Sequence, residues 1–129
     1  MYDIPILFLI FNRPDTTEIV FNCIREIQPL RLYVASDAPR TGRLDEVERC
    51  AEAREIVSRI DWPCELKTLF RDQNLGCKRA VSEAISWFFE NEEYGIISED
   101  DCLPDLSFFP FCEELLIKYK DDERIEHIG

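Results

Sequence analysis

The chain has 129 residues, a formal net charge of −12 and a hydrophobic fraction of 46%. This length suits one compact domain, and the apolar content is sufficient for a packed core, which argues against an intrinsically disordered chain. The negative charge argues against nucleic acids and anionic membranes as partners, because both require a basic face. An anionic substrate would need a metal ion or a few well-placed Arg and Lys side chains.

The six cysteines show no metal-site or disulfide pattern. No two of them have the C-x₂-C spacing of a zinc site, and the single histidine, His127, cannot complete a Cys/His site. The apolar run over residues 4–11 is short, contains Pro5 and lacks a basic leader. It therefore indicates neither a signal peptide nor a membrane-spanning helix. We therefore expect reduced thiols in a cytoplasmic protein without an integral membrane segment.

Apolar strand-like runs alternate with amphipathic segments along the chain. Residues 4–11 are apolar on both faces, as in a central parallel strand. After a break at residues 12–14, Asp15 and Glu18 have the spacing of a helix capping box and precede apolar residues at helical intervals. This pattern predicts a strand followed by a helix.

The following segments repeat the alternation. Residues 32–35 predict a second strand, residues 45–59 a second helix, and residues 65–70 a third, more exposed strand. A third helix is expected after the turn at residues 74–76. Residues 94–98 predict a fourth strand, which ends at three consecutive acids.

Two further elements are expected near the C-terminus, a helical segment between Asp105 and Tyr119 and a strand over residues 124–128. Strand–helix alternation of this kind predicts a mostly parallel sheet with helices on both faces, which is a three-layer α/β/α domain over residues 1–129. Because the last strand stops at the chain end, we expect the domain to be a fragment of a longer protein, truncated at its C-terminus.

Polar or charged residues follow the carboxyl end of each predicted strand. They are Asn12 and Arg13, Asp37, residues 71–76, and the acids at 99–101. In open α/β sheets ligands bind at this edge, so these segments are expected to surround one site. Three adjacent carboxylates repel one another, and a divalent ion such as Mg²⁺ or Mn²⁺ would hold them together.

The residue types suggest how such a site would work. Asp37 would accept hydrogen bonds from a base or a ribose. Asn74 and Gly76 lead into a helix N-terminus, where backbone N–H groups favour a phosphate, and Lys78 and Arg79 add positive charge. With a metal ion held by the acids, the site would suit a nucleoside diphosphate attached to a transferable group.

Each of these interpretations has a plain alternative. Asp37 can cap its own loop through an Asx turn, and Asn74 with Gly76 can be only a turn before a helix. Lys78 and Arg79 can form a solvated helix face. The acid run can equally be a solvated turn.

Three stretches resemble one enzyme family. Residues 99–109, EDDCLPDLSFF, are similar to the "EDD…PDFF" stretch of N-acetylglucosaminyltransferase I-type enzymes, where the triplet is the variant of the metal-binding DXD motif. Residues 5–14 resemble the first strand and nucleotide loop of that superfamily, and residues 74–80 resemble the "NxGxxxA" helix start of family-2-like transferases. The chain thus resembles, over essentially its whole length, the nucleotide-binding part of a GT-A glycosyltransferase.

This resemblance implies a Rossmann-like GT-A fold that binds a nucleoside-diphosphate sugar, with a UDP-sugar favoured. By position, Asp101 would coordinate Mn²⁺ or Mg²⁺, Asp100 would contact the ribose or a metal-bound water, and Glu99 would lie near the donor sugar. Asp37 would read the base. The nucleotide pocket would be lined by Phe11, Asn12 and Arg13. The acceptor would be a glycan, lipid or protein, and the catalytic base would lie beyond residue 129.

Two other functions stay open. The same acids could serve a Mg²⁺-dependent phosphoryl or nucleotidyl transferase, although the first strand is followed by neither a nucleophilic aspartate nor a glycine-rich loop. Alternatively, the chain is a non-catalytic α/β interaction module, or a protein named for a phenotype such as hemolysis. Metal-dependent binding of a UDP-sugar or GDP-sugar that Asp101→Ala abolishes would support the glycosyltransferase, and nucleotide binding that this change leaves unaffected would favour the alternatives that need no metal.

Overall fold

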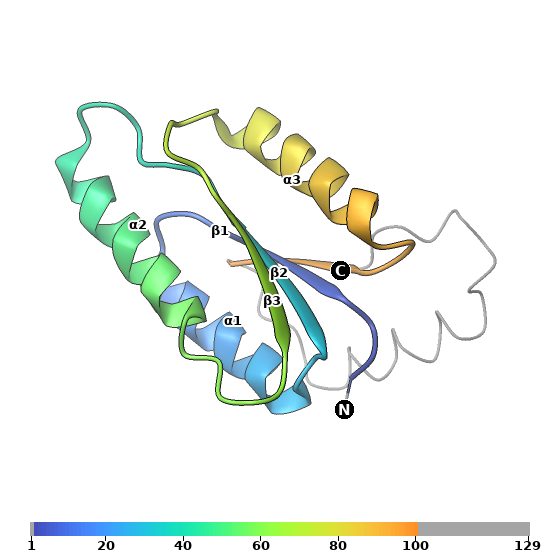
Figure 1. The fold of residues 1–129 in the computed structure, drawn as a ribbon. Coiled ribbons are helices and arrows are strands. Elements are labelled where there is room, and N and C mark those ends of the chain that lie inside the picture. The colour runs from blue at the N-terminus through green and yellow to red at the C-terminus, as the bar shows by residue number, and fades with distance from the viewer. Residues whose placement is uncertain (1, 101–129) are drawn as a thin grey trace.

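The computed structural model describes residues 2–100, which form a four-stranded sheet between two layers of helices (Figure 1). In chain order the elements are β1 Ile6–Ile10, α1 Pro14–Ile27, β2 Arg31–Ser36, α2 Leu44–Val57, β3 Glu65–Phe70, α3 Cys77–Asn91 and β4 Ile96–Glu99. The described strands are all parallel, in the order β3-β2-β1-β4. The predicted parallel α/β sheet is therefore confirmed, and it is compatible with a Rossmann-like fold. Asp101 and the elements predicted after it lie outside the described residues.

Strand β1 lies at the centre of the sheet, and all five of its residues are buried. Ile6, Phe8 and Ile10 belong to one hydrophobic cluster, whereas Leu7 and Leu9 belong to a second cluster on the opposite face. Successive side chains of a strand point to opposite faces, so a strand covered on both sides needs an uninterrupted apolar run. This is why β1 shows no polar alternation in the sequence.

Helices α1 and α2 cover one face of the sheet, and α3 covers the other (Figure 1). The first cluster includes Val20, Phe21 and Ile24 from α1 and Ala53, Ile56 and Val57 from α2. The second includes Ala84 and Phe88 from α3. The prediction of helices on both faces is confirmed. None of the described helices combines the length and the apolar content needed to cross a membrane.

The start of α1 differs from the sequence prediction. The helix begins at Pro14, its N-cap is Arg13, and no side chain caps it, so the capping box predicted for Asp15 and Glu18 is wrong. Proline is favoured at the first helical position because its ring fixes φ and it has no N–H to satisfy. Asp15 instead lies in the first turn, where its charge complements the helix dipole.

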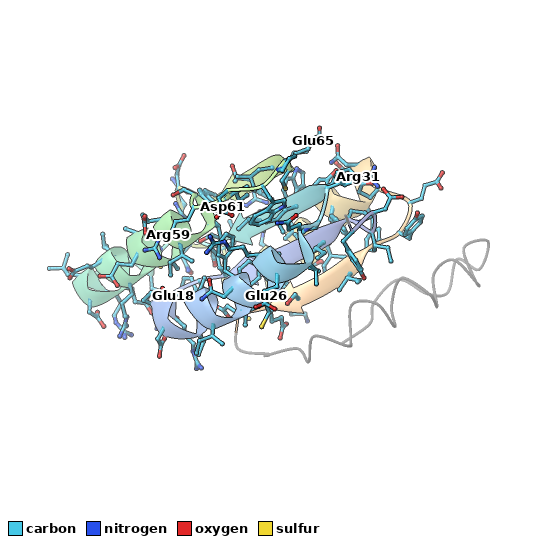
Figure 2. All side chains as sticks on the ribbon, turned by 90° about the horizontal axis from the view of Figure 1, so that it is seen from below. Glu18, Glu26, Arg31, Arg59, Asp61 and Glu65 are labelled. Atoms are coloured by element: carbon cyan, nitrogen blue, oxygen red, sulfur yellow. The ribbon has the colours of Figure 1, made fainter. Side chains whose placement is uncertain are left out.

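Ion pairs on the outer surface link α1 to the segment after α2. Arg59 lies 3.4 Å from Glu18, and Arg25 pairs with Asp61; Figure 2 shows Glu18, Arg59 and Asp61 on this exposed side. All four side chains are about half exposed. Such pairs contribute little to stability, so the two hydrophobic clusters hold the layers together.

Candidate functional site

A pocket of about 430 Å³ lies at the carboxyl edge of the sheet. The predicted site residues that line it are Phe11, Asn12, Arg13, Asp37, Asn74, Gly76, Glu99 and Asp100. They follow or end all four described strands, because the carboxyl ends of parallel strands share one edge. The predicted convergence of these segments is confirmed, and the volume lies within the usual range of small-molecule sites, about 300–1,000 Å³.

Lys78 and Arg79 do not line this pocket. Both are exposed on the first turn of α3, beside a separate, more open depression. The Nε of Arg79 donates a hydrogen bond to Glu83 one turn later, at 3.0 Å. Contact of these two residues with a nucleotide stays a prediction. A ligand in the main pocket would instead meet α3 at Gly76, Cys77, Ala80 and Val81.

Asp37, at the end of β2, is buried and its carboxylate is fully engaged by the protein. Oδ1 accepts hydrogen bonds from the backbone N–H groups of Ala38 and Leu75, both at 2.9 Å. Oδ2 accepts from the backbone N–H of Gly76 and from the side-chain amide of Asn74, both at 3.1 Å. An ionised carboxylate offers about four lone-pair positions, and these four bonds use them. Reading of a base by Asp37 stays a prediction that requires one of these bonds to open.

Gly76 is the N-cap of α3 and has φ 89° and ψ 150°. This backbone region is open essentially to glycine alone. No side chain caps α3, and its first turn carries no acid, whereas α1 has Asp15 and α2 has Asp45 and Glu46 in their first turns. The acid nearest to this helix start is Asp37, from the end of β2, whose carboxylate accepts the backbone N–H groups of Leu75 and Gly76 and so faces the positive end of the α3 dipole.

Glu46, in the first turn of α2, is a buried acid that the sequence did not reveal. Its Oε1 accepts from the backbone N–H and the Nε of Arg40, and its Oε2 accepts from the side-chain amide of Asn12, each at 3.0 Å. The Arg40 guanidinium also pairs with Oε2. The bonds from Arg40 outweigh burial and lower the pKa of Glu46 to about 2.

The sequence carries no local signal for this cluster. Acids in the first turn of a helix are usually solvated, and the partners of Glu46 come from two different loops, 6 and 34 residues away. Glu46 joins the loop after β1 to the loop after β2. It was therefore absent from the predicted site, although it fixes two side chains that line the pocket.

Arg54, further along α2, makes a second connection of this kind. Its guanidinium donates to the carbonyl oxygens of Asp37 at 3.1 Å and Arg71 at 2.9 Å, and to the hydroxyl of Ser36 at 3.1 Å. It also lies 4.9 Å from the centre of the Phe70 ring, within range of a cation–π interaction. Arg54 thus ties together the carboxyl ends of β2 and β3.

The pocket is lined by both positive and negative side chains. Arg13 follows β1 and Arg71 follows β3, and neither side chain forms an ion pair within residues 2–100. Glu99 and Asp100 lie at the end of β4, where Asp100 Oδ2 accepts a hydrogen bond from the backbone N–H of Phe11 at 3.2 Å. The arrangement can bind an anion through the arginines and a cation through the acids.

The acids fit a hard divalent ion only as part of a larger set. Among residues 2–100, no group of three or more His, Cys, Asp or Glu side chains is placed to hold a metal ion. Glu99 and Asp100 bring carboxylate oxygens, the ligand type that Mg²⁺ and Mn²⁺ prefer, to the pocket. The residue predicted as the metal ligand, Asp101, directly follows them but lies outside the described range.

The fold and the pocket geometry alone do not assign the chain to a family, so the chain was compared with known proteins. Comparison with protein-family models, with curated proteins and with solved structures finds no match. What the site binds must therefore be inferred from its own residues.

Proposed function

We propose that this domain binds a nucleoside-diphosphate sugar together with Mn²⁺ or Mg²⁺ and acts as the donor-binding part of a GT-A type glycosyltransferase. The observation that carries the proposal is the composition of the pocket. The guanidinium groups of Arg13 and Arg71, which have no carboxylate partner in the described chain, share one pocket with the carboxylates of Glu99 and Asp100. A ligand that carries both a diphosphate and a bound cation matches both kinds of group.

The extent of the pocket favours an elongated ligand. It is lined by residues from the ends of all four strands. Neighbouring strands lie about 4.8 Å apart, so the tips of β3 and β4 are separated by roughly 14 Å. A single phosphate would occupy only part of this edge. A base, a diphosphate and a sugar in sequence would span it.

Each group of pocket residues has a distinct role in this proposal. Arg13, Arg71 and the N-terminus of α3 bind the diphosphate, since guanidinium groups and helix N-termini both favour phosphate oxygens. Asp101, with Asp100 beside it, holds the divalent ion. That ion supplies stabilisation of the negative charge on the diphosphate leaving group. The domain contributes binding and orientation of the donor, and the resemblance of the acid motif to glycosyltransferases selects a sugar as the group transferred.

Calorimetric titration tests the proposal. UDP-sugars and GDP-sugars are titrated into the wild-type chain with and without Mn²⁺, and into Arg13→Ala, Arg71→Ala and Asp101→Ala variants. We expect Mn²⁺-dependent binding that R13A and R71A each weaken by about tenfold, the usual loss for one charge-assisted hydrogen bond. D101A should abolish the dependence on Mn²⁺.

A matched control is Arg59→Ala, which removes an exposed arginine on the outer surface, away from the pocket. R59A should bind like the wild type. Equal affinities for R59A, R13A and R71A would contradict the proposal, as would the absence of nucleotide binding with any divalent ion. Binding that D101A leaves unchanged would favour a site that needs no metal.

A further inference from the structure

Helix α2 supports the pocket without lining it. No residue of α2 is among those that surround the pocket, yet two of its charged side chains reach the same edge of the sheet. Glu46 and Arg54 lie about two helical turns apart and so on the same side of the helix. Glu46 is completely buried, and its partners Asn12 and Arg40 both line the pocket. A fully buried carboxylate here therefore acts on the pocket only through other side chains.

We propose that Glu46 is a positioning residue of the ligand pocket, which acts by holding Asn12 and Arg40. This inference rests on the proposed function in so far as the ligand is a nucleotide sugar. Asn12 donates its side-chain amide to Glu46 at 3.0 Å, and Arg40 is bound through its backbone N–H, its Nε and its terminal guanidinium nitrogen. Arg40 is 52% exposed, and a side chain of that length would otherwise sample many rotamers.

The contact between Glu46 and Arg40 also determines which pocket residues carry an unpaired positive charge. Glu46 neutralises Arg40, so among the arginines that line the pocket only Arg13 and Arg71 have no carboxylate partner within residues 2–100. Without the Glu46 carboxylate, Arg40 would become a third cation for a phosphate to contact. A small anion would then have an additional cation to bind. A nucleotide sugar, in contrast, would lose the fixed positions of Asn12 and Arg40 that orient it.

This difference gives a test that a loss of stability alone cannot mimic. Glu46→Gln replaces acceptors by an amide whose NH₂ group faces the donors of Asn12 and Arg40. The affinities of a UDP-sugar and of inorganic pyrophosphate are measured on the same sample with Mn²⁺. We expect the ratio of UDP-sugar affinity to pyrophosphate affinity to fall by about tenfold in E46Q, as for the loss of one charge-assisted hydrogen bond. An unchanged ratio would overturn the proposal.

Val57→Ala is the matched control. Val57 is buried on the same helix but belongs to the hydrophobic cluster and does not line the pocket. V57A should lower the urea midpoint because it opens a cavity, and it should leave the affinity ratio at the wild-type value. An equal fall of the ratio in V57A and E46Q would mean that the effect is only loss of stability. If E46Q does not fold, Glu46→Asp tests the positioning role alone: it keeps the charge, but its shorter side chain should hold Asn12 and Arg40 less well, so the affinity ratio should still fall, and an unchanged ratio would overturn the proposal.

A measurement without ligand separates this inference from the proposed function. In the NMR spectrum of the free wild type, the Arg40 Nε–H should give a slowly exchanging signal, and E46Q should lose it. A wild type that shows this signal but binds no nucleotide would refute the proposed function and leave the contact intact. A wild type that binds nucleotide but exchanges the Arg40 Nε–H as fast as the Nε–H of the exposed Arg13, which has no ion pair within residues 2–100, would refute the positioning role.

Discussion

The carboxylate of Asp37 accepts a hydrogen bond from the backbone N–H of Gly76, 39 residues further along the chain, at 3.1 Å. Together with the bonds from Leu75 and Asn74, it joins the end of β2 to the start of α3. The wall of the pocket between these elements is therefore held in shape by an acid whose acceptor positions are all in use.

Asp37→Asn should reveal whether this acid shapes the pocket or reads the base. The amide presents one acceptor oxygen, so donors that face its NH₂ group lose their partner. We expect a loss of about 1–3 kcal/mol in the free energy of unfolding, measured with urea. If Asp37 holds the turn, D37N weakens UDP and GDP binding by the same factor. A change in the preference between the two nucleotides would instead show that Asp37 contacts the base.

Gly76→Ala should disturb both stability and binding. A Cβ at position 76 has free space, but φ is +89°, so the cost lies in the backbone and is about 1–3 kcal/mol. Because Gly76 lines the pocket, nucleotide affinity should fall as well. Gly42→Ala is the control, since Gly42 also has positive φ (+82°) and free space but lies outside the pocket. A normal nucleotide affinity in G76A would show that the turn before α3 is not part of the site.

Glu46 should make stability fall in acid. Its pKa is lowered from 4.5 to about 2 in the folded state, because the Arg40 guanidinium binds the carboxylate. The ionised Glu46 carboxylate therefore adds to the free energy of unfolding above about pH 4.5, and this stabilisation is lost as the pH falls toward 2. Urea unfolding of wild type and E46Q from pH 7 to pH 2 measures it. The difference in their unfolding free energies should be constant above about pH 5 and shrink below it; a constant difference down to pH 2 would contradict the assignment.

Cys77 should be the most reactive of the described thiols, and bound nucleotide should protect it. Cys77 is exposed and lines the pocket, whereas Cys50 is buried and Cys23 and Cys64 are partly buried. Burial also raises the pKa values of the Cys23, Cys50 and Cys64 thiols, which slows their reaction as thiolates. Iodoacetamide labelling followed by peptide mass spectrometry gives the rate at each site. Labelling of Cys77 that is indifferent to UDP-sugar and Mn²⁺ would place the ligand elsewhere.

Gly95→Ala should affect the fold but not the pocket. A Cβ on Gly95 would collide with the ring of Phe88 and lie 2.9 Å from the carbonyl oxygen of Pro5. Both neighbours are buried, so we expect a loss of about 1–3 kcal/mol in the free energy of unfolding, as for overpacked cores. Gly95 precedes β4, at the amino edge of the sheet, and nucleotide affinity should be unchanged. A smaller loss when Phe88→Leu is added would confirm the clash as the cause.

The sequence predicted the layers of this domain well, because they follow from periodic patterns. Strand β3 has the predicted bounds, and the continuous apolar run of β1 correctly indicated a strand buried on both faces. The start of α1 was misplaced because Asp15 and Glu18 matched a capping box while Pro14 already fixed the first turn. Local rules compete at a helix start, and the sequence does not say which one prevails.

The candidate site was predictable only where it follows from topology. Asn12, Asp37 and Glu99 were expected at one edge because each is at or just after the carboxyl end of a strand, and they do line one pocket. The partners of Asp37 and the burial of Glu46 were not foreseeable in this way. They depend on contacts between loops that are distant in the chain, and such contacts produce no characteristic spacing of residues in the sequence.

The central place of β1 has a consequence for synthesis of the chain. β1 pairs with β2 on one side and with β4 on the other, and β4 begins only at Ile96. At about 5–20 residues per second, the ribosome needs on the order of ten seconds to reach β4 after β1 has been made. During that interval the second edge of an apolar strand has no neighbour, and unpaired edges of this type invite aggregation. A nascent chain stalled before residue 96 should therefore depend on chaperones, whereas the finished chain covers that edge itself.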